Sequence, residues 1–191
     1  IPMEVADRKG KHFQFKKDEF PKPHTTMEKL QSLPTIYDNP TVTAGNSPGL
    51  NDGATALVLI SERKLKELNV TPLAEIITTA SFADRPNYLA ITPAYDLAFD
   101  DLSLIEINEA FAAVPLVSSQ ILAEKYGEET KDIHQKLNVN GGSIAIGHPV
   151  GATGARIVMT LMYELKRRGG GYGTAAICGG LAQGDAIMIK V

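Results

Sequence analysis

From Gly53 onward the chain alternates continuous apolar runs with amphipathic stretches, and this alternation limits the folds that are open to it. An unbroken apolar run is typical of a strand buried on both faces, whereas apolar residues three and four apart indicate a helix. The runs predict strands at 54–60, 73–80, 104–107, 137–140, 173–178 and 186–191. Helices are expected over 61–68, 108–126 and 151–168. Such alternation is typical of a layered α/β domain.

The first 40 residues differ from this pattern, because they are rich in lysine, proline and threonine and only weakly periodic. One short helix is expected over 26–33, where Thr25 or Thr26 can cap it and Met27, Leu30 and Leu33 share a face. Six lysines make the stretch locally basic: Lys9, Lys11, Lys16, Lys17, Lys22 and Lys29. Taken alone, such a run is usually a solvated face.

Charge and hydropathy argue against two classes of partner. The formal net charge of −3 is opposite to that of a protein built to bind nucleic acid or an anionic membrane. No apolar run approaches the ~20 residues that a membrane-spanning helix needs. Ile1 is not an initiator methionine and no signal-like stretch follows it, so we expect the chain to begin within a longer protein or after processing.

The single cysteine, Cys178, excludes an intrachain disulfide and favours a reducing compartment, for which we expect the cytoplasm. No metal site is expected, because none of the histidines lies at ligand spacing from another histidine or from Cys178. The histidines are His12, His24, His134 and His148.

A glycine-rich stretch, N-V-N-G-G-S-I-A-I-G-H-P-V-G-A-T-G, surrounds His148 between a predicted strand and a predicted helix. Glycines at such a turn allow a substrate to lie against the main chain, and the helix start directs N–H groups and a positive dipole end toward it. His148 would then sit where negative charge is stabilised and protons are moved. A lone histidine is more often structural, so the residue alone does not establish catalysis.

Two further segments place reactive side chains at strand ends. Cys178 ends an apolar strand and is followed by Gly179 and Gly180, which leaves its thiol accessible. A free cysteine is usually a small buried hydrophobe, but a positive neighbour or a helix dipole would make it a usable base. In E-I-N-E-A-F-A-A, Asn108 is either a helix N-cap or the holder of a water in an oxyanion hole, and Phe111 would then wall an acyl pocket.

Taken together, these segments resemble the thiolase family. The resemblance rests on N-x-x-G-G-x-I-A-x-G-H-P-x-G-A-T-G, C-x-G-x-A-x-G-x-A and N-E-A-F in this order, and on T-V-T-A-G-N-S-P-G-L-N-D-G-A. It covers the C-terminal half of a thiolase. It implies a layered α/β/α half with a mixed five-stranded sheet, preceded by part of a coenzyme A-binding loop region. We therefore expect the loop region over 1–49 and the C-terminal thiolase-fold domain over 50–191.

The resemblance also implies roles for individual residues. His148 would activate a cysteine that becomes acylated, and would share an oxyanion hole with the water held by Asn108. Cys178 would take the α-proton in synthesis and return it in cleavage. A backbone N–H at Gly180 would contribute to a second oxyanion hole. Coenzyme A thioesters would be substrates, with no other cofactor, and would contact Lys22, Ala44, Gly45, Ser47 and Phe111.

Three departures from the family pattern follow from the residues. The acylated cysteine is absent, because the only cysteine matches the base position, so the chain alone cannot run the covalent cycle. Ser47-Pro48-Gly49 replaces the A-S-G that is common in the family, so a hydroxyl that meets the pantetheine arm is displaced or lost. The stretch over 93–101 is about a helix shorter than expected, through a deletion or through residues left out of the sequence.

The leading interpretation is a thiolase fragment or subunit whose partner is the missing N-terminal half, and which is expected to form a homo-oligomer, a dimer or tetramer. The alternative is a non-catalytic thiolase-like protein that binds coenzyme A or acyl groups. A ketoacyl synthase fits poorly, because Cys178 occupies the position of its second base. The thiolase-like sterol carrier type carries a histidine where this chain has Asn108.

Overall fold

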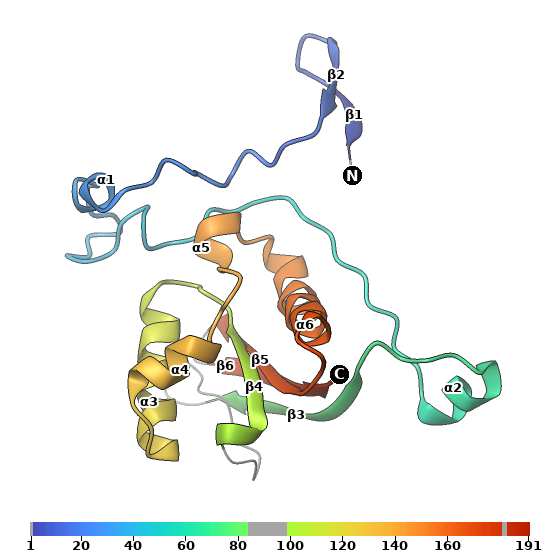
Figure 1. The fold of residues 1–191 in the computed structure, drawn as a ribbon. Coiled ribbons are helices and arrows are strands. Elements are labelled where there is room, and N and C mark those ends of the chain that lie inside the picture. The colour runs from blue at the N-terminus through green and yellow to red at the C-terminus, as the bar shows by residue number, and fades with distance from the viewer. Residues whose placement is uncertain (1, 84–98, 181–182) are drawn as a thin grey trace.

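The computed structural model describes residues 2–83, 99–180 and 183–191 (Figure 1). The described strands are β1 (Met3–Ala6), β2 (His12–Phe15), β3 (Glu75–Ala83), β4 (Leu102–Ile107), β5 (Tyr172–Gly180) and β6 (Gln183–Lys190). The helices are α1 (Met27–Gln31), α2 (Glu62–Leu68), α3 (Ala113–Tyr126), α4 (Thr130–Lys136), α5 (Ser143–Ile146) and α6 (Val150–Arg167), with a 3-10 turn, η1, at Phe99–Asp101.

A mixed sheet with the strand order β3-β6-β5-β4 forms the centre of the domain. β4 and β5 are parallel, and β6 is antiparallel to both β5 and β3. Because β4 and β5 run in the same direction, their C-terminal ends meet at one edge, where Ile107 pairs with Ala176. The described sheet thus brings Asn108 and Cys178, each one or two residues beyond this pair, to the same edge.

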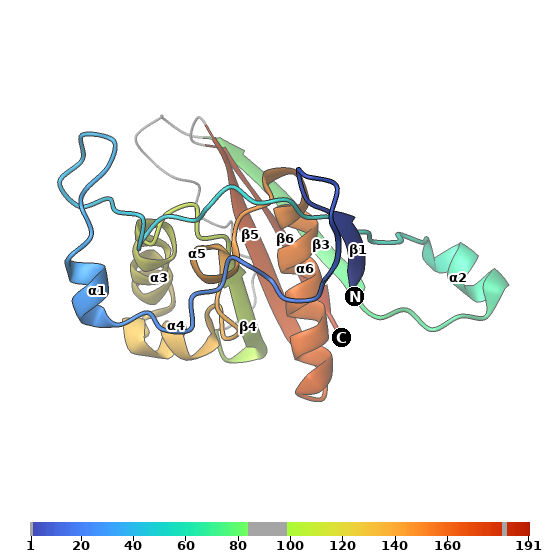
Figure 2. The ribbon, with the colours of Figure 1, turned by 90° about the horizontal axis from the view of Figure 1, so that it is seen from above.

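Helices cover both faces of β4, as alternation along a strand requires. Leu104 packs into a cluster with α6 and β5, whereas Ile105 and Ile107 pack on the other side against α3 and α4. Figures 1 and 2 both show α3 and α4 on the opposite side of β4 from α6. This arrangement confirms the layered mixed α/β fold that the sequence indicates.

Most elements with strong local signals form close to their predicted bounds. The expected strands at 73–80, 104–107, 173–178 and 186–191 are β3, β4, β5 and β6, and the helix expected over 151–168 is α6. Thr26 and Ser61 cap α1 and α2, each accepting a hydrogen bond from the backbone N–H three residues later. These caps satisfy donors that the first helical turn leaves unpaired.

The predicted strand at 54–60 is wrong. This stretch is extended but pairs with no strand in the described part of the chain, and it is largely exposed. Val58 and Leu59 are 93% and 76% exposed, which is the opposite of a strand buried on both faces. The described sheet contains four strands, against the six that the apolar runs predict and the five that the family resemblance implies.

The predicted strand at 137–140 is also wrong, and a side chain explains why. Only Leu137 forms a bridge, with Ile105, and Asn138 then turns the chain with φ = 46°. The Asn138 amide accepts a hydrogen bond from the Ile107 N–H and donates one to the Ile107 carbonyl oxygen. One side chain therefore replaces the two backbone partners that a further strand residue would have supplied.

The helix expected over 108–126 begins five residues late, at Ala113, because 108–112 are drawn into contacts with two other loops. The sequence did not predict the exposed hairpin β1–β2 or the helix α4. Of the shortened stretch at 93–101, only η1 lies within the described residues.

None of the helices in the described part of the chain has the length and apolar character that crossing a bilayer requires. Within those same residues, histidine, cysteine and acidic side chains do not gather in a group of three or more that could hold a metal ion.

Candidate functional site

Three loops that are far apart in the sequence meet beyond the C-terminal end of β4. The Asn108 N–H donates to the Ala176 carbonyl oxygen at 2.9 Å, which ties the first loop to β5. The Ala112 N–H donates to the carbonyl oxygen of Asn46 at 2.9 Å. The His148 N–H donates to the carbonyl oxygen of Gly49 at 2.9 Å. The structure thus brings together 46–51, 108–112 and 143–148, all of which the sequence singled out.

Asn108 lies at the centre of this junction and is only 3% exposed. Its Oδ1 accepts a hydrogen bond from the Ser143 hydroxyl at 2.6 Å. Its Nδ2 is buried and has no hydrogen-bond partner among the described residues. A buried donor left unpaired costs about 1–3 kcal/mol, so a group supplied from outside these residues is the natural acceptor for Nδ2. Asn108 is not the N-cap of α3, since that position belongs to Ala112.

Two glycines of the histidine loop allow side chains from the other two loops to approach its backbone. A Cβ at Gly142 would lie 2.4 Å from the carboxyl carbon of Glu109. A Cβ at Gly147 would lie 2.3 Å from Oδ1 of Asn51, and Gly147 also has φ = 89°, which disfavours other residues. These glycines therefore serve the close packing of the loops on one another.

His148 is half-buried and lies just before α6. Its Nδ1 is 2.7 Å from Oγ1 of Thr153, whose own hydroxyl proton goes to the Pro149 carbonyl oxygen at 2.9 Å. With that proton on the Pro149 carbonyl oxygen, Thr153 accepts from Nδ1–H, and this tautomer places the lone pair on Nε2. Burial, and then the charge of Arg156, lower the pKa of His148, so its neutral form is favoured at pH 7. His148 is therefore arranged as a base.

Arg156 and Ser143 belong to this site, although the sequence indicated no role for Ser143 within its motif and did not indicate Arg156 at all. The guanidinium of Arg156 donates to the Gly147 carbonyl oxygen and to the Ser143 hydroxyl, each at 2.8 Å. Nothing in the periodicity of α6 separates Arg156 from Arg167 on the same helix or from Arg168 at its C-cap. Both of these bind Glu164 instead. Only the tertiary contacts distinguish it.

A buried carboxyl, Glu106, lies on β4 beside this site. Burial, followed by the charges of Glu109 and Glu164, raises the pKa of Glu106 to about 7, against the lowering effect of Arg156. Glu106 therefore takes up a proton near neutral pH, unlike an exposed glutamate.

Cys178 lies near the end of β5, on the same edge as Asn108, and is half-buried. Burial raises the pKa of its thiol, which hydrogen bonds from the backbone N–H groups of Cys178 and Gly180 partly oppose. The positive neighbour that would lower this pKa is not found within the described residues. Cys178 also forms no hydrogen bond there with His148 or Asn108. Gly180 follows an irregularity in the β5–β6 pairing and has φ = 74°.

The residues expected to contact coenzyme A lie on both sides of the 46–51 loop. Phe20 packs against Gly49, where a Cβ would come within 2.3 Å of the Phe20 ring. Lys22 lies two residues after Phe20 in the sequence, with its Nζ 6.0 Å from the centroid of the same ring. Ser47 is half-buried, and Phe111, 39% exposed, ends the N-E-A-F segment. Ala44 is exposed, whereas Gly45 packs against α1, with a Cβ there only 2.6 Å from Leu30.

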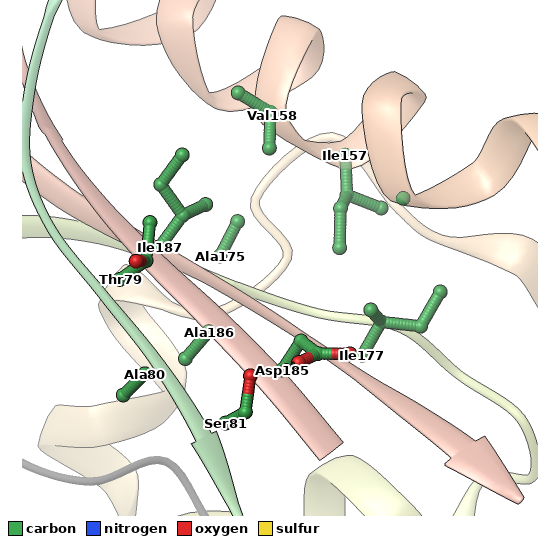
Figure 3. Close-up of a pocket in the computed structure, with 11 residues that line it drawn as sticks. Thr79, Ala80, Ser81, Ile157, Val158, Ala175, Ile177, Asp185, Ala186 and Ile187 are labelled. Atoms are coloured by element: carbon green, nitrogen blue, oxygen red, sulfur yellow. Dashed lines mark hydrogen bonds between the residues drawn. The ribbon is translucent and has the colours of Figure 1, made fainter.

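A separate groove of about 410 Å³ lies between α6 and the strands β3, β6 and β5 (Figure 3). Ile157 and Val158 of α6 face Ile187 across it, and Ser81 and Asp185 supply polar atoms on the sheet side. None of the predicted catalytic residues lines this groove.

Two family models match this chain. The one described as "Thiolase, C-terminal domain" matches residues 70–191, and the one described as "Thiolase, N-terminal domain" matches residues 1–63. An acetyl-CoA acetyltransferase of Thiocystis violacea is 42% identical over 100% of this chain and 49% of its own length. The mitochondrial 3-ketoacyl-CoA thiolase of Homo sapiens is 41% identical over 99% of this chain and 48% of its own length.

Solved structures give the same result. The crystal structure of the Bacillus anthracis acetyl-CoA acetyltransferase superposes with a TM-score of 0.84 at 40% identity, covering 100% of this chain and 48% of that protein. The human mitochondrial 3-ketoacyl-CoA thiolase in complex with CoA superposes with a TM-score of 0.82 at 37% identity, over 98% of this chain and 47% of that one. This chain thus spans about half the length of the proteins it matches.

Proposed function

Because this chain belongs to the thiolase family, we propose that it is half of an enzyme that condenses acyl-CoA thioesters or cleaves 3-ketoacyl-CoA by thiolysis. The observation that carries the proposal is the junction of three loops. There the buried Asn108 Nδ2 has no partner among the described residues, and the Thr153 contact at Nδ1 of His148 favours the tautomer with its lone pair on Nε2. Acyl transfer needs such a base and such a donor. We assign the acylated cysteine to the half of the protein that this chain does not contain.

In the first step, Nε2 of His148 takes the proton of the partner cysteine, whose sulfur bonds to the thioester carbonyl carbon. The Nδ1 contact with Thr153 supports this role, because it leaves Nε2 unprotonated. A water held by Asn108 Nδ2 donates to the carbonyl oxygen as it becomes negative. Coenzyme A leaves as its thiol after His148 returns the proton.

In the second step, ionised Cys178 takes a proton from the α-carbon of a second acyl-CoA. The new carbanion bonds to the acyl carbon, and the partner sulfur leaves as a thiolate. Burial raises the pKa of the Cys178 thiol, so its thiolate is a strong base but forms only when another group takes the thiol proton. We assign this proton to the partner thiolate released at the end of the cycle, which restores both cysteines for the next turnover. The Gly180 N–H, near the end of the same strand, would donate to the enolate oxygen. Thiolysis reverses these steps.

The exposed apolar surfaces support the assignment of the missing half. Leu57, Val58, Leu59 and Ile60 form an extended exposed run, and the groove beside α6 is largely apolar. We propose that residues outside this chain cover both, because burying apolar surface stabilises a protein by about 25 cal/mol per Å². We further propose that residues 1–49 are part of the coenzyme A-binding loop region and that residues 50–191 form the C-terminal thiolase-fold domain. We also propose that the protein assembles as a dimer or tetramer and is located in the cytoplasm.

The proposal is tested by incubating the full-length protein that contains this chain with acetyl-CoA. Mass spectrometry should detect an acetyl adduct on the protein, and coupled assay should detect acetoacetyl-CoA formation and its thiolysis. Binding of coenzyme A with neither adduct nor turnover would instead identify the non-catalytic thiolase-like alternative.

Lys22→Ala should weaken coenzyme A binding at low salt, and by less at high salt. Lys22 is exposed beside the Phe20–Gly49 contact, and a lysine near a phosphate acts as a point charge that salt screens. Calorimetric titration of the full-length variant at two ionic strengths measures the effect. Lys9→Ala, in the turn of the exposed hairpin, is the matched control and should bind normally. An unchanged dissociation constant for Lys22→Ala at low salt removes Lys22 from the site.

A further inference from the structure

We propose that Arg156 and Ser143 are positioning residues that hold the Asn108 amide and the His148 loop in one fixed arrangement. This inference rests on the proposed acyl-transfer function. It concerns residues that do not themselves touch the reacting atoms. Their effect would be exerted through Asn108 and through the backbone preceding His148.

The direction of the hydrogen bonds follows from what each group can donate. A guanidinium has donors only, so Ser143 must accept from Arg156 at 2.8 Å. The single Ser143 proton is then free to go to Asn108 at 2.6 Å, and the Asn108 atom that receives it must be Oδ1. A flipped amide would instead donate to the Ser143 oxygen and leave the Ser143 proton without this acceptor. The series Arg156, Ser143, Asn108 therefore leaves Nδ2 as the atom available to the site.

The other terminal nitrogen of the Arg156 guanidinium links these hydrogen bonds to the loop that carries His148. It donates to the carbonyl oxygen of Gly147, the residue before His148, at 2.8 Å. Both nitrogens belong to one planar, rigid group, so the spacing between Ser143 and Gly147 is set by the guanidinium itself. A lysine ammonium has donors for both acceptors, but on its flexible stem it would not fix the spacing between them.

Two neighbouring carboxyl groups favour the charged form of Arg156. Burial lowers the pKa of Arg156, while the carboxylates of Glu106 and Glu109 oppose that effect. Glu109 also accepts a hydrogen bond from the Ile144 N–H at 2.9 Å, one residue after Ser143. In such a low-dielectric network each hydrogen bond polarises the next, which favours donation from Nδ2.

A double-mutant cycle in the full-length protein tests this proposal. Ser143→Ala and Arg156→Met should each slow acylation by about tenfold or more with KM changed less than about twofold, whereas Arg156→Lys should recover part of the loss. Asn108→Ala should slow acylation by about 10²-fold, as expected when an oxyanion-hole donor is lost. If Ser143 acts through Asn108, the variant that combines Ser143→Ala with Asn108→Ala should be no slower than Asn108→Ala alone.

Arg167→Met, near the other end of α6 with its side chain 70% exposed, is the matched control and should acylate at the normal rate. Multiplying effects in the double variant, or a normal rate in Ser143→Ala, would overturn the positioning role. Absence of any acyl adduct in the unmodified protein would instead overturn the proposed function. In that case crystal structures of the variants would still test the positioning role. The Asn108 side chain should be displaced in Ser143→Ala and unmoved in Arg167→Met.

Discussion

His148→Ala in the full-length protein is expected to slow both acylation and steady-state turnover by about 10²–10⁴-fold, the range for loss of a general base. The expectation follows from the local geometry, because Thr153 accepts from Nδ1–H and leaves Nε2 as the basic atom. Rapid-quench mass spectrometry of the adduct measures acylation, and a coupled assay measures turnover.

The pH profile gives a second readout of His148. The neutral imidazole is the active form, and burial and Arg156 lower its pKa below the usual 6.5. A group needed in its deprotonated form loses activity as the pH falls through its pKa, so the acid limb of kcat/KM should lie below pH 6.5. His134→Ala is a suitable control, since Nε2 of His134 contacts the Ser119 hydroxyl on α3, away from the three-loop junction. A His148→Ala variant that acylates normally would exclude His148 as the base.

Cys178→Ala is expected to form the acyl-enzyme at a near-normal rate and yet to turn over at least about 10²-fold more slowly. Acylation precedes the step in which the α-proton moves, and only the later step uses the Cys178 thiolate. Cys178 is the only cysteine of this chain, so a thioester adduct in this variant must lie on residues outside it.

The same two assays, run side by side, separate the roles of Cys178 and His148. Exchange of the α-protons of acetyl-CoA with deuterium gives a third measurement, and it should be lost in Cys178→Ala but retained in Arg167→Met. Turnover of Cys178→Ala at the normal rate would show that Cys178 is a structural cysteine, the commoner role of a free buried thiol.

The candidate site was predictable where a reactive residue stands in a distinctive local pattern. Asn108, His148, Cys178 and Gly180 all follow or end apolar stretches and adjoin glycine or a loop, and the structure places each of them at a strand or helix end. The residues that support them were not predictable. The role of Arg156 depends on its hydrogen bond to Ser143, 13 residues away, and the role of Ser143 depends on its hydrogen bond to Asn108, 35 residues away. No local sequence pattern encodes such distant contacts.

The sequence by itself determined the elements whose signals are local. The caps Thr26 and Ser61 act through hydrogen bonds within three residues, so α1 and α2 form near their predicted bounds. The apolar stripe of α6 packs on distant strands, but its spacing along the chain is a local signal that indicates the helix.

Only the tertiary structure decided the elements whose partners are distant. The run over 54–60 has the composition of a buried strand, but a strand needs neighbours for its backbone donors and acceptors, and none of the described residues supplies them. Residues 108–112 have helix-forming neighbours, but the hydrogen bond from Ala112 to Asn46 holds them in a loop. In both places a long-range hydrogen bond, made or missing, outweighs local propensity, because each propensity is worth less than about 1 kcal/mol per residue.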